Sequence, residues 1–275
     1  TPAVSDDLSD EEAEALRSHY ERKPQFWTIL LSGRDDDNGG TDTNILVAVD
    51  VPNGYVYGVS IPRDTKSSIN GKNRKINFAY NAGGMELLAD TISGQLGIPV
   101  DYTVLVNLKG FQALVDTIGG VDFYIPVDMH YEDPYQNLSI HFSKGMRHLS
   151  GEEALKVVRC RSAYASQDIG RMQTQQDFLK AVAKQLMTPE IALKLPDLCG
   201  IFINYVETDL NAGNLAWLGG EVLNMGMDNI SFATLPGEWH DPYIYLDQEE
   251  VLAMVNQYLN PYTEDRTAED LNILT

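Results

Sequence analysis

The chain alternates short apolar runs with amphipathic stretches, the pattern of a protein that mixes strands and helices. Residues 27–32 form an almost continuous apolar run, which is typical of a strand buried on both faces of a sheet. Two further strands, over 44–50 and 55–61, are separated by Pro52, Asn53 and Gly54, and this spacing predicts a hairpin.

Helical periodicity follows. Over 83–96, apolar residues recur at i, i+3, i+4 and i+7, which predicts an amphipathic helix. A strand over 102–107, a helix over 109–118 and a strand over 121–125 come next. This alternation predicts an α/β fold with a layered architecture, and the hairpin makes the sheet mixed rather than purely parallel.

The stretch over 157–176 has arginines at positions that should face the interior of the protein. Val157 and Val158 give its first part strand character, so Arg159 and Arg161 should share one face of a strand. A helix opened by a capping box of Ser150 and Glu153 should precede it.

The second part of this stretch has helical periodicity. Arg171, Gln175, Phe178 and Val182 fall within about 60° of one another on a helical wheel. Since Phe178 and Val182 should face the core, Arg171 and Gln175 should face inward too. Three arginines and a glutamine then converge on one interior spot.

Buried cations are costly unless an anion meets them, so two interpretations remain open. One is a structural salt-bridge cluster with carboxylates of this chain. The other is a bound oxyanion, since the guanidinium fork suits phosphate as well as carboxylate. Asp168 is the only acid between 157 and 176, which favours the oxyanion.

Charge is distributed unevenly along the chain. Twenty basic residues against forty acidic ones give a net charge of −20, which argues against general nucleic-acid binding. Yet five of the cations lie within the thirteen residues of 63–75. A short basic run is often a solvated loop, but in an acidic protein it is also a selective feature.

Cysteine and histidine contribute little. Two buried, unpaired thiols at Cys160 and Cys199 are favoured over a bridge. The five histidines show no zinc-ligand spacing, and none completes a known nucleophilic triad motif. There is also no apolar run of eighteen residues or more.

A glycine-rich loop after the first strand carries candidate metal ligands. Asp35 and Asp42 flank this loop, and two such carboxylates can hold a Mg²⁺ that a phosphate ligand completes. The alternative is a soluble turn without a metal. Arg63 and Lys75 follow the third strand and should reach the same edge of the sheet, where ligands of open α/β sheets usually bind.

A set of collinear motifs from about residue 27 to 186 resembles the LytR-CpsA-Psr family. They read TDTNILVAVD, SIPRDT, KINFAY, LLADTISGQLGIPVDYTVLVNLKGFQALVDTIGGVDFYIP, KGMRHLSGEEAL and VVRCR…DIGRMQTQQ. The resemblance implies a three-layer α/β/α fold with a mixed central sheet and a hydrophobic tunnel between sheet and helices. It also implies a membrane-anchored extracytoplasmic enzyme that moves an anionic glycopolymer from a polyprenyl-pyrophosphate carrier onto peptidoglycan.

Carried over motif by motif, the resemblance implies a role for particular residues. The metal, Mg²⁺ or Mn²⁺, would be held by Asp35 and Asp42. The catalytic set is Asp35, Asp42, Arg63, Arg159 and Arg161. The pyrophosphate-binding set is Arg63, Lys75, Arg159, Arg161, Arg171 and Gln175. The implied lipid tunnel would be lined by Phe78, Leu88, Ile92, Val104, Val106 and Phe111, and the alternative is that these apolar residues are plain core, as such stripes more often are.

Three positions depart from the family pattern. Gly40, Asp37 and Thr174 stand where the family commonly has arginines. These replacements lower the positive charge around the phosphates and affect headgroup specificity, while the residues tied most directly to catalysis are kept.

The resemblance also sets expectations for organisation and setting. We expect an N-terminal flank over 1–24 after a membrane anchor, a catalytic core over 25–187, a C-terminal part over 188–262 packed on the same domain, and a tail over 263–275. The expected location is the extracytoplasmic face of a Gram-positive cell membrane, without nucleic acid. Two other functions stay open, a Mg²⁺-dependent polyprenyl-pyrophosphate hydrolase and a non-catalytic module that binds polyprenyl phosphates.

Overall fold

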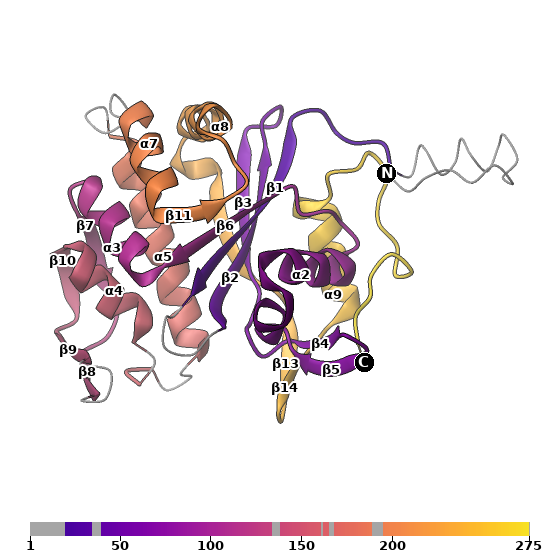
Figure 1. Ribbon diagram of the computed structural model, residues 1–275, viewed down its shortest axis with the longest axis horizontal. Coiled ribbons are helices and arrows are strands. Elements are labelled where there is room, and N and C mark those ends of the chain that lie inside the picture. The colour runs from indigo at the N-terminus through magenta and orange to yellow at the C-terminus, as the bar shows by residue number, and fades with distance from the viewer. Residues whose placement is uncertain are drawn as a thin grey trace, which may run out of the picture.

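A mixed six-stranded sheet forms the centre of the protein (Figure 1). The computed structural model describes residues 20–34, 40–133, 138–160, 162–164, 168–188 and 195–274. The strand order is β11-β6-β1-β2-β3-β12, in which β1 pairs parallel with β6 and antiparallel with β2, and β3 pairs parallel with β12. The strands are β1 (Phe26–Arg34), β2 (Thr41–Asp50), β3 (Tyr55–Ser60), β6 (Tyr102–Asn107), β11 (Val206–Thr208) and β12 (Ile230–Thr234).

Helices cover both faces of this sheet, which confirms the three-layer α/β/α architecture (Figure 1). One face carries α2 (Phe78–Leu96) and α9 (Gln248–Met254), followed by a π-helical turn, Val255–Leu259. The other face carries α3 (Leu108–Thr117), α4 (Gly151–Arg159), α5 (Asp168–Leu186), α7 (Leu195–Tyr205) and α8 (Ala212–Met225).

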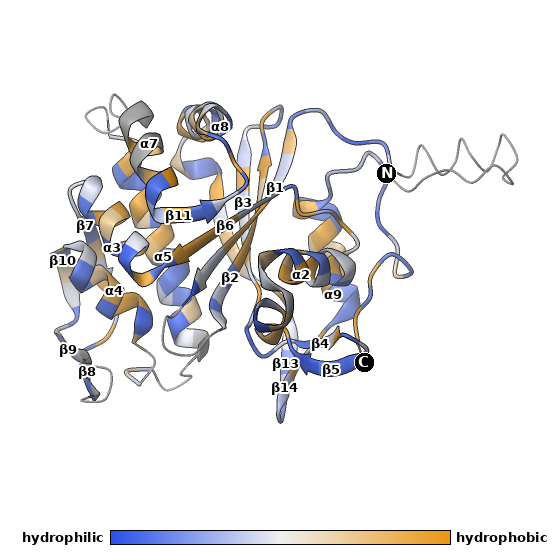
Figure 2. Ribbon diagram, in the orientation of Figure 1, coloured by the Kyte–Doolittle hydropathy of each residue, from blue (hydrophilic) through white to orange (hydrophobic). Residues whose placement is uncertain are grey.

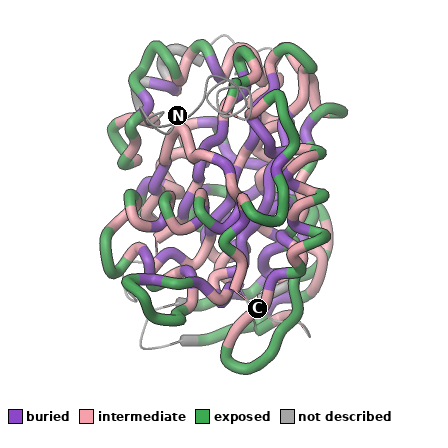
Figure 3. The backbone as a smooth tube through the Cα atoms, turned by 90° about the vertical axis from the view of Figure 1, so that its right-hand side faces the viewer, coloured by how far each residue is buried: buried purple, intermediate pink, exposed green. Residues whose placement is uncertain are grey.

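Each face of the sheet has its own apolar core because successive side chains on a strand point to opposite sides. Leu30 and Leu46 pack with Leu88 and Ile92 of α2, whereas Ile29 packs on the opposite face with residues from α8. Much of β1 and β6 is accordingly apolar in Figure 2, and the buried segments run through the middle of the molecule in Figure 3. The expected hairpin of β2 and β3 is confirmed.

The helix predicted over 83–96 begins earlier, at Phe78, and is interrupted at Gly83 and Gly84. Gly84 has φ +68° and ψ −160°, a conformation that L side chains rarely adopt. The predicted apolar stripe still faces the core, with Leu88 and Ile92 fully buried.

The strand predicted at 157–161 is wrong, since Val157, Val158 and Arg159 are the last residues of helix α4. The capping box of Ser150 and Glu153 is confirmed and starts this helix. The local helix start and the packing of the buried Val157 outweigh the β-preference of the two valines. Cys160 then leaves the helix with an extended backbone, and Arg161 lies outside the described residues.

Four two-stranded elements surround this framework. They pair β4 (Lys66–Ile69) with β5 (Lys72–Lys75), β7 (Val121–Ile125) with β10 (Gly145–Leu149), β8 (Met129–Asp133) with β9 (Leu138–Phe142), and β13 (Gly237–His240) with β14 (Tyr243–Leu246). Among the helices described, none combines the length and apolarity needed to cross a membrane.

Candidate functional site

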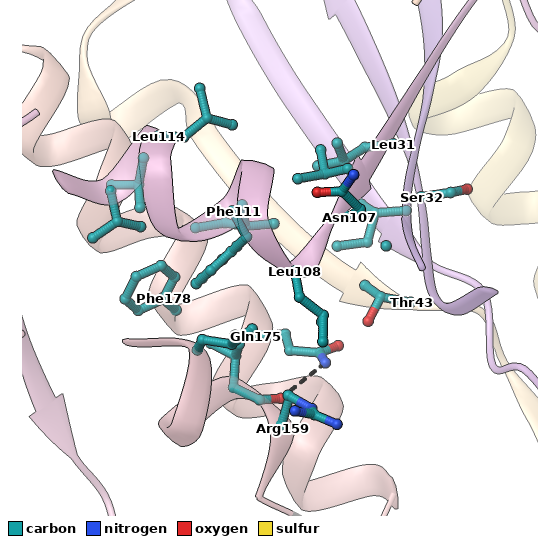
Figure 4. Close-up of a pocket in the computed structure, with 18 of the residues that line it drawn as sticks. Leu31, Ser32, Thr43, Asn107, Leu108, Phe111, Leu114, Arg159, Gln175 and Phe178 are labelled. Carbon is teal, nitrogen blue, oxygen red and sulfur yellow. Dashed lines mark hydrogen bonds between the residues drawn. The ribbon is translucent and has the colours of Figure 1, made fainter. Parts of the chain in front are cut away.

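A cavity of about 660 Å³ lies between the sheet and the helices of the α3–α5 layer. This volume falls in the range of small-molecule sites. Figure 4 shows side chains of α3, α4 and α5 and the ends of β1 and β2 converging on it. Leu114 and Phe178 lie at the left of this view, Thr43 lies at the right, and Arg159 lies below the centre.

Most of the cavity wall is apolar and comes from four helices. The apolar side chains of α3, α5, α7 and α8 that line it are Leu108, Phe111, Leu114, Val115, Phe178, Leu179, Val182, Leu186, Leu198, Phe202 and Leu215. Cys199 also lines it, and burial raises the pKa of its thiol, so the thiol stays neutral at pH 7. Cys160 and Cys199 are buried free thiols, as predicted.

Helix α5 runs along the cavity and changes character from one end to the other. Arg171 and Gln175 line the cavity from its first turns, and Phe178, Val182 and Leu186 line it from later turns. At 1.5 Å per residue, the wall from Arg171 to Leu186 extends about 22 Å. One helical stripe therefore provides both a cationic end and an apolar body, and the predicted inward stripe is confirmed.

The cationic end is held in place by contacts with two neighbouring elements. Arg171 is 3% exposed, and its Nη2 donates to the Asp42 carbonyl at 3.5 Å. Gln175 Nε2 donates to the Val158 carbonyl at 3.1 Å, which ties α5 to the end of α4 (Figure 4). Arg159, the last residue of α4, lines the cavity beside Gln175.

Asp42 begins a chain of alternating charges that leads away from the cavity. Its Oδ1 lies 2.6 Å from Arg63 Nη1, Arg63 Nε lies 3.8 Å from Asp64 Oδ1, and Lys75 Nζ lies 2.9 Å from the same oxygen. Arg63 and Lys75 are therefore both paired with carboxylates of this chain. Arg159 and Arg171 line the cavity.

Arg34 is a site residue that was not predicted from the sequence. Arg34 ends β1 and lines the cavity, and its Nη1 donates to the Tyr80 hydroxyl at 3.1 Å. Its position next to Asp35, at the end of a buried strand, was the available signal. The contribution of α7 and α8 had no such signal, because an apolar helix face shows burial without showing what it faces.

Only part of the predicted tunnel lies at this cavity. Val106 and Phe111 line it. Leu88 and Ile92 pack instead in the core on the other face of the sheet, and Phe78 is 42% exposed. Val104 packs among the residues of the Ile29 cluster. The α2 residues of the predicted set thus pack on the face of the sheet opposite this cavity, and periodicity does not reveal on which side of a sheet a helix packs.

Two of the predicted site residues, Asp35 and Arg161, lie outside the described residues, as does Asp37. Thr174, where the family commonly has arginine, is 2% exposed and turns its hydroxyl to the Gly170 carbonyl and the Tyr164 hydroxyl. A threonine at this position therefore serves the packing of α5 against 162–164.

The fold and this cavity define the class of protein. It is an α/β/α protein with an apolar pocket between sheet and helices, and arginines line one end of that pocket. The LytR_cpsA_psr family model matches residues 3–264. The chain belongs to the LytR-CpsA-Psr family.

Similar proteins agree with this assignment. A relative from Bacillus cereus, the polyisoprenyl-teichoic acid–peptidoglycan teichoic acid transferase TagU, is 33% identical over 218 residues, covering 78% of this chain and 69% of the relative. Bacillus subtilis TagU is 34% identical over 198 residues, covering 70% of this chain and 63% of the relative. The crystal structure of B. subtilis TagV matches with a TM-score of 0.76 and 28% identity, covering 88% of this chain and all of TagV (100%).

Proposed function

We propose that this protein is a phosphotransferase that moves an anionic glycopolymer from a polyprenyl-pyrophosphate carrier onto peptidoglycan during cell-wall assembly. The observation that carries the proposal is the cavity with an apolar body and an arginine-lined end, because a polyprenyl pyrophosphate has the same division of chemistry. The similarity to TagU, whose name describes a transfer from a polyisoprenyl carrier to peptidoglycan, supports the same conclusion.

In this proposal the prenyl chain lies against the apolar residues of α3, α5, α7 and α8. The pyrophosphate lies against Arg34, Arg159, Arg171 and Gln175, where cations compensate the charge of its oxygens. A peptidoglycan hydroxyl attacks the phosphorus that bears the glycan. A new P–O bond forms, the bridging P–O bond breaks, and the prenyl phosphate leaves. Positioning and charge neutralisation by these side chains are the main contributions to such a transfer.

Asp42 is the described carboxylate that lines the cavity and is our candidate for accepting the proton of the attacking hydroxyl. Its Oδ1 is fixed by Arg63, so the carboxylate is held in one orientation. The pairing of Arg63 with Asp42 gives Arg63 a positioning role, and the pairing of Lys75 with Asp64 supports Arg63 in turn.

The donor chemistry of this end fits Mg²⁺, which the family resemblance implies. Within the described residues no group of three or more His, Cys, Asp or Glu could hold a metal ion. Mg²⁺ is commonly bound by one or two carboxylates together with substrate phosphates, and Asp42, with Asp35 as the second predicted ligand, would supply them. When bound, the ion would neutralise charge on the phosphate oxygens.

We further propose that the reaction takes place at the extracytoplasmic face of a Gram-positive cell membrane, with a membrane anchor N-terminal to this chain. The similar transferases are Bacillus proteins whose names specify peptidoglycan as acceptor, and peptidoglycan lies outside the membrane.

Transfer is tested with a synthetic polyprenyl-pyrophosphate glycan, peptidoglycan oligomers and Mg²⁺, with mass spectrometry of the products. We expect a glycan–phosphate–peptidoglycan product from the wild type, none from Asp42→Asn, and a wild-type yield from the control Asp122→Asn. Release of free glycan phosphate without transfer would identify a hydrolase instead. Binding of the lipid with no turnover would identify a binding module.

A further inference from the structure

The β8–β9 hairpin brings two histidines together that are far apart in sequence. His130 and His141 are direct partners in the antiparallel register. One face of the hairpin is apolar and buries Met129, Ile140 and Phe142, and both histidines project from the opposite, exposed face. The alternation of a strand thus places both imidazoles in solvent, side by side.

The distance between the two Nδ1 atoms matches the separation of two nitrogens that bind one metal ion. His130 Nδ1 lies 3.3 Å from His141 Nδ1. Two nitrogens bound to one Zn²⁺ at 2.0–2.1 Å with a tetrahedral angle are separated by about 3.3 Å. In the absence of a metal the same distance accommodates a hydrogen bond, with one imidazole donating to the other.

A carboxylate on the same face positions one of these rings. Glu132 Oε1 contacts His141 Nε2, and the Ser139 hydroxyl donates to the same oxygen at 2.8 Å. A proton on Nε2 of His141 leaves the lone pair of its Nδ1 directed at His130, and metal-bound histidines commonly have such a carboxylate behind them.

We propose that His130 and His141 form a Zn²⁺-binding site, with Glu132 as the positioning residue. Borderline transition ions of similar preference would also bind, because imidazole suits them better than Mg²⁺ or Ca²⁺. The described residues contain no cluster of three converging ligands, so two nitrogens come from the protein and water completes the shell.

The location of the site gives it a structural consequence. Tyr131, between His130 and Glu132, lines the cavity. An ion shared by His130 and His141 joins the two strands of the hairpin and restrains the segment that carries Tyr131. The site is separate from the predicted Asp35–Asp42 site and does not depend on the proposed transfer.

Isothermal titration of the purified protein with Zn²⁺, in competition with a chromogenic chelator, tests the site. We expect one Zn²⁺ per chain, at least tenfold weaker binding in His130→Ala and His141→Ala, and about 10–100-fold weaker binding in Glu132→Gln. His148→Ala is the matched control, because His148 is an exposed histidine that contacts Asp122 instead of another histidine. Equal affinity in the wild type and in His130→Ala or His141→Ala would overturn the proposal, as would an affinity lost only in His148→Ala.

Hydrogen exchange tests the restraint without any substrate. Zn²⁺ should slow amide exchange in Met129–Glu132 and Ser139–Phe142 of the wild type and of His148→Ala, but not of His141→Ala. Unchanged exchange in the wild type at saturating Zn²⁺, or equal slowing in His141→Ala, would contradict the role of the ion in joining the strands.

Discussion

Both ends of the cavity include residues of α5, but the two ends depend on different interactions. At the apolar end, many side chains from four helices share the contact surface, so each contributes a modest part. At the cationic end, a few charged groups have fixed partners, such as the buried Arg171 against the Asp42 carbonyl. Dispersion and burial tolerate substitution of similar volume, whereas a buried charge requires its partners.

This difference suits a ligand with a variable body and a constant head. A long prenyl chain can be held by any continuous apolar wall, but a pyrophosphate needs donors at defined positions. We therefore predict that substitutions at the cationic end lower kcat, whereas substitutions at the apolar end raise KM for the lipid substrate.

The largest effect is expected at the junction of the two ends. Phe178 is 1% exposed and contacts the rings of Phe111 and Phe123 at 5.6 and 5.5 Å between centroids. Phe178→Ala should lower the free energy of unfolding by about 3–5 kcal/mol, because it removes a buried ring and leaves a void. Urea denaturation measures this, and Phe78→Ala, at an exposed ring, should cost about 1 kcal/mol or less. Equal losses would show that the buried ring of Phe178 contributes no more to stability than an exposed ring does.

The next largest effect is expected on kcat, at the cationic end of the cavity. Arg171→Gln should reduce kcat by about 10²–10³-fold, because a preorganised charge at the transferring phosphate is lost. Arg147, an exposed arginine paired with Glu153, gives the control Arg147→Gln, which should retain the wild-type kcat. A rise in KM alone for Arg171→Gln would assign Arg171 to ground-state binding.

A smaller effect is expected at the apolar end. Leu186 lines the cavity near the C-terminal end of α5, about 22 Å along the helix from Arg171. Leu186→Trp should raise KM for a long prenyl substrate about tenfold, since the indole occupies space used by the chain, and should leave kcat unchanged. A substrate with a short prenyl chain should be unaffected, and so should Lys184→Trp, at an exposed position of α5. Equal effects on short and long chains would place the lipid elsewhere.

The smallest effect concerns an ion pair outside the cavity. His148 Nδ1 donates to Asp122 at 2.8 Å, which raises the pKa of His148. A raised folded-state pKa stabilises the protein below the unfolded pKa, and this contribution disappears as pH rises through the folded pKa. For so exposed a pair we expect only a few tenths of a kcal/mol. NMR titration should show a lower His148 pKa in Asp122→Asn, and an unchanged value would attribute the shift to the Gly119 carbonyl.

The β8–β9 hairpin adds a third kind of contact to this comparison. Its histidines have no packing role, since both project from the exposed face, and they meet only through strand pairing. The sequence shows no zinc-ligand spacing at these histidines, because ten residues separate the two positions and their proximity arises from the hairpin register.

Periodicity in the sequence determined the framework. The apolar run of β1, the β2–β3 hairpin, the strand β6 and the stripe of α5 were predictable, because each depends on local alternation of apolar and polar residues. The collinear motifs then indicated the LytR-CpsA-Psr family. The inward direction of Arg171 and Gln175 followed from the same stripe, and this was the part of the site that the sequence could supply.

Only the tertiary structure decided which buried residues face the cavity and which cation meets which carboxylate. Leu88 and Val106 have the same apolar signature, yet one packs in the core and the other lines the cavity. Arg63 and Arg171 are both cations near Asp42, yet one pairs with its carboxylate and the other with its carbonyl. The physical reason is that a sequence pattern indicates whether a side chain is buried. Which residue that side chain contacts depends on how elements distant in the sequence pack against one another.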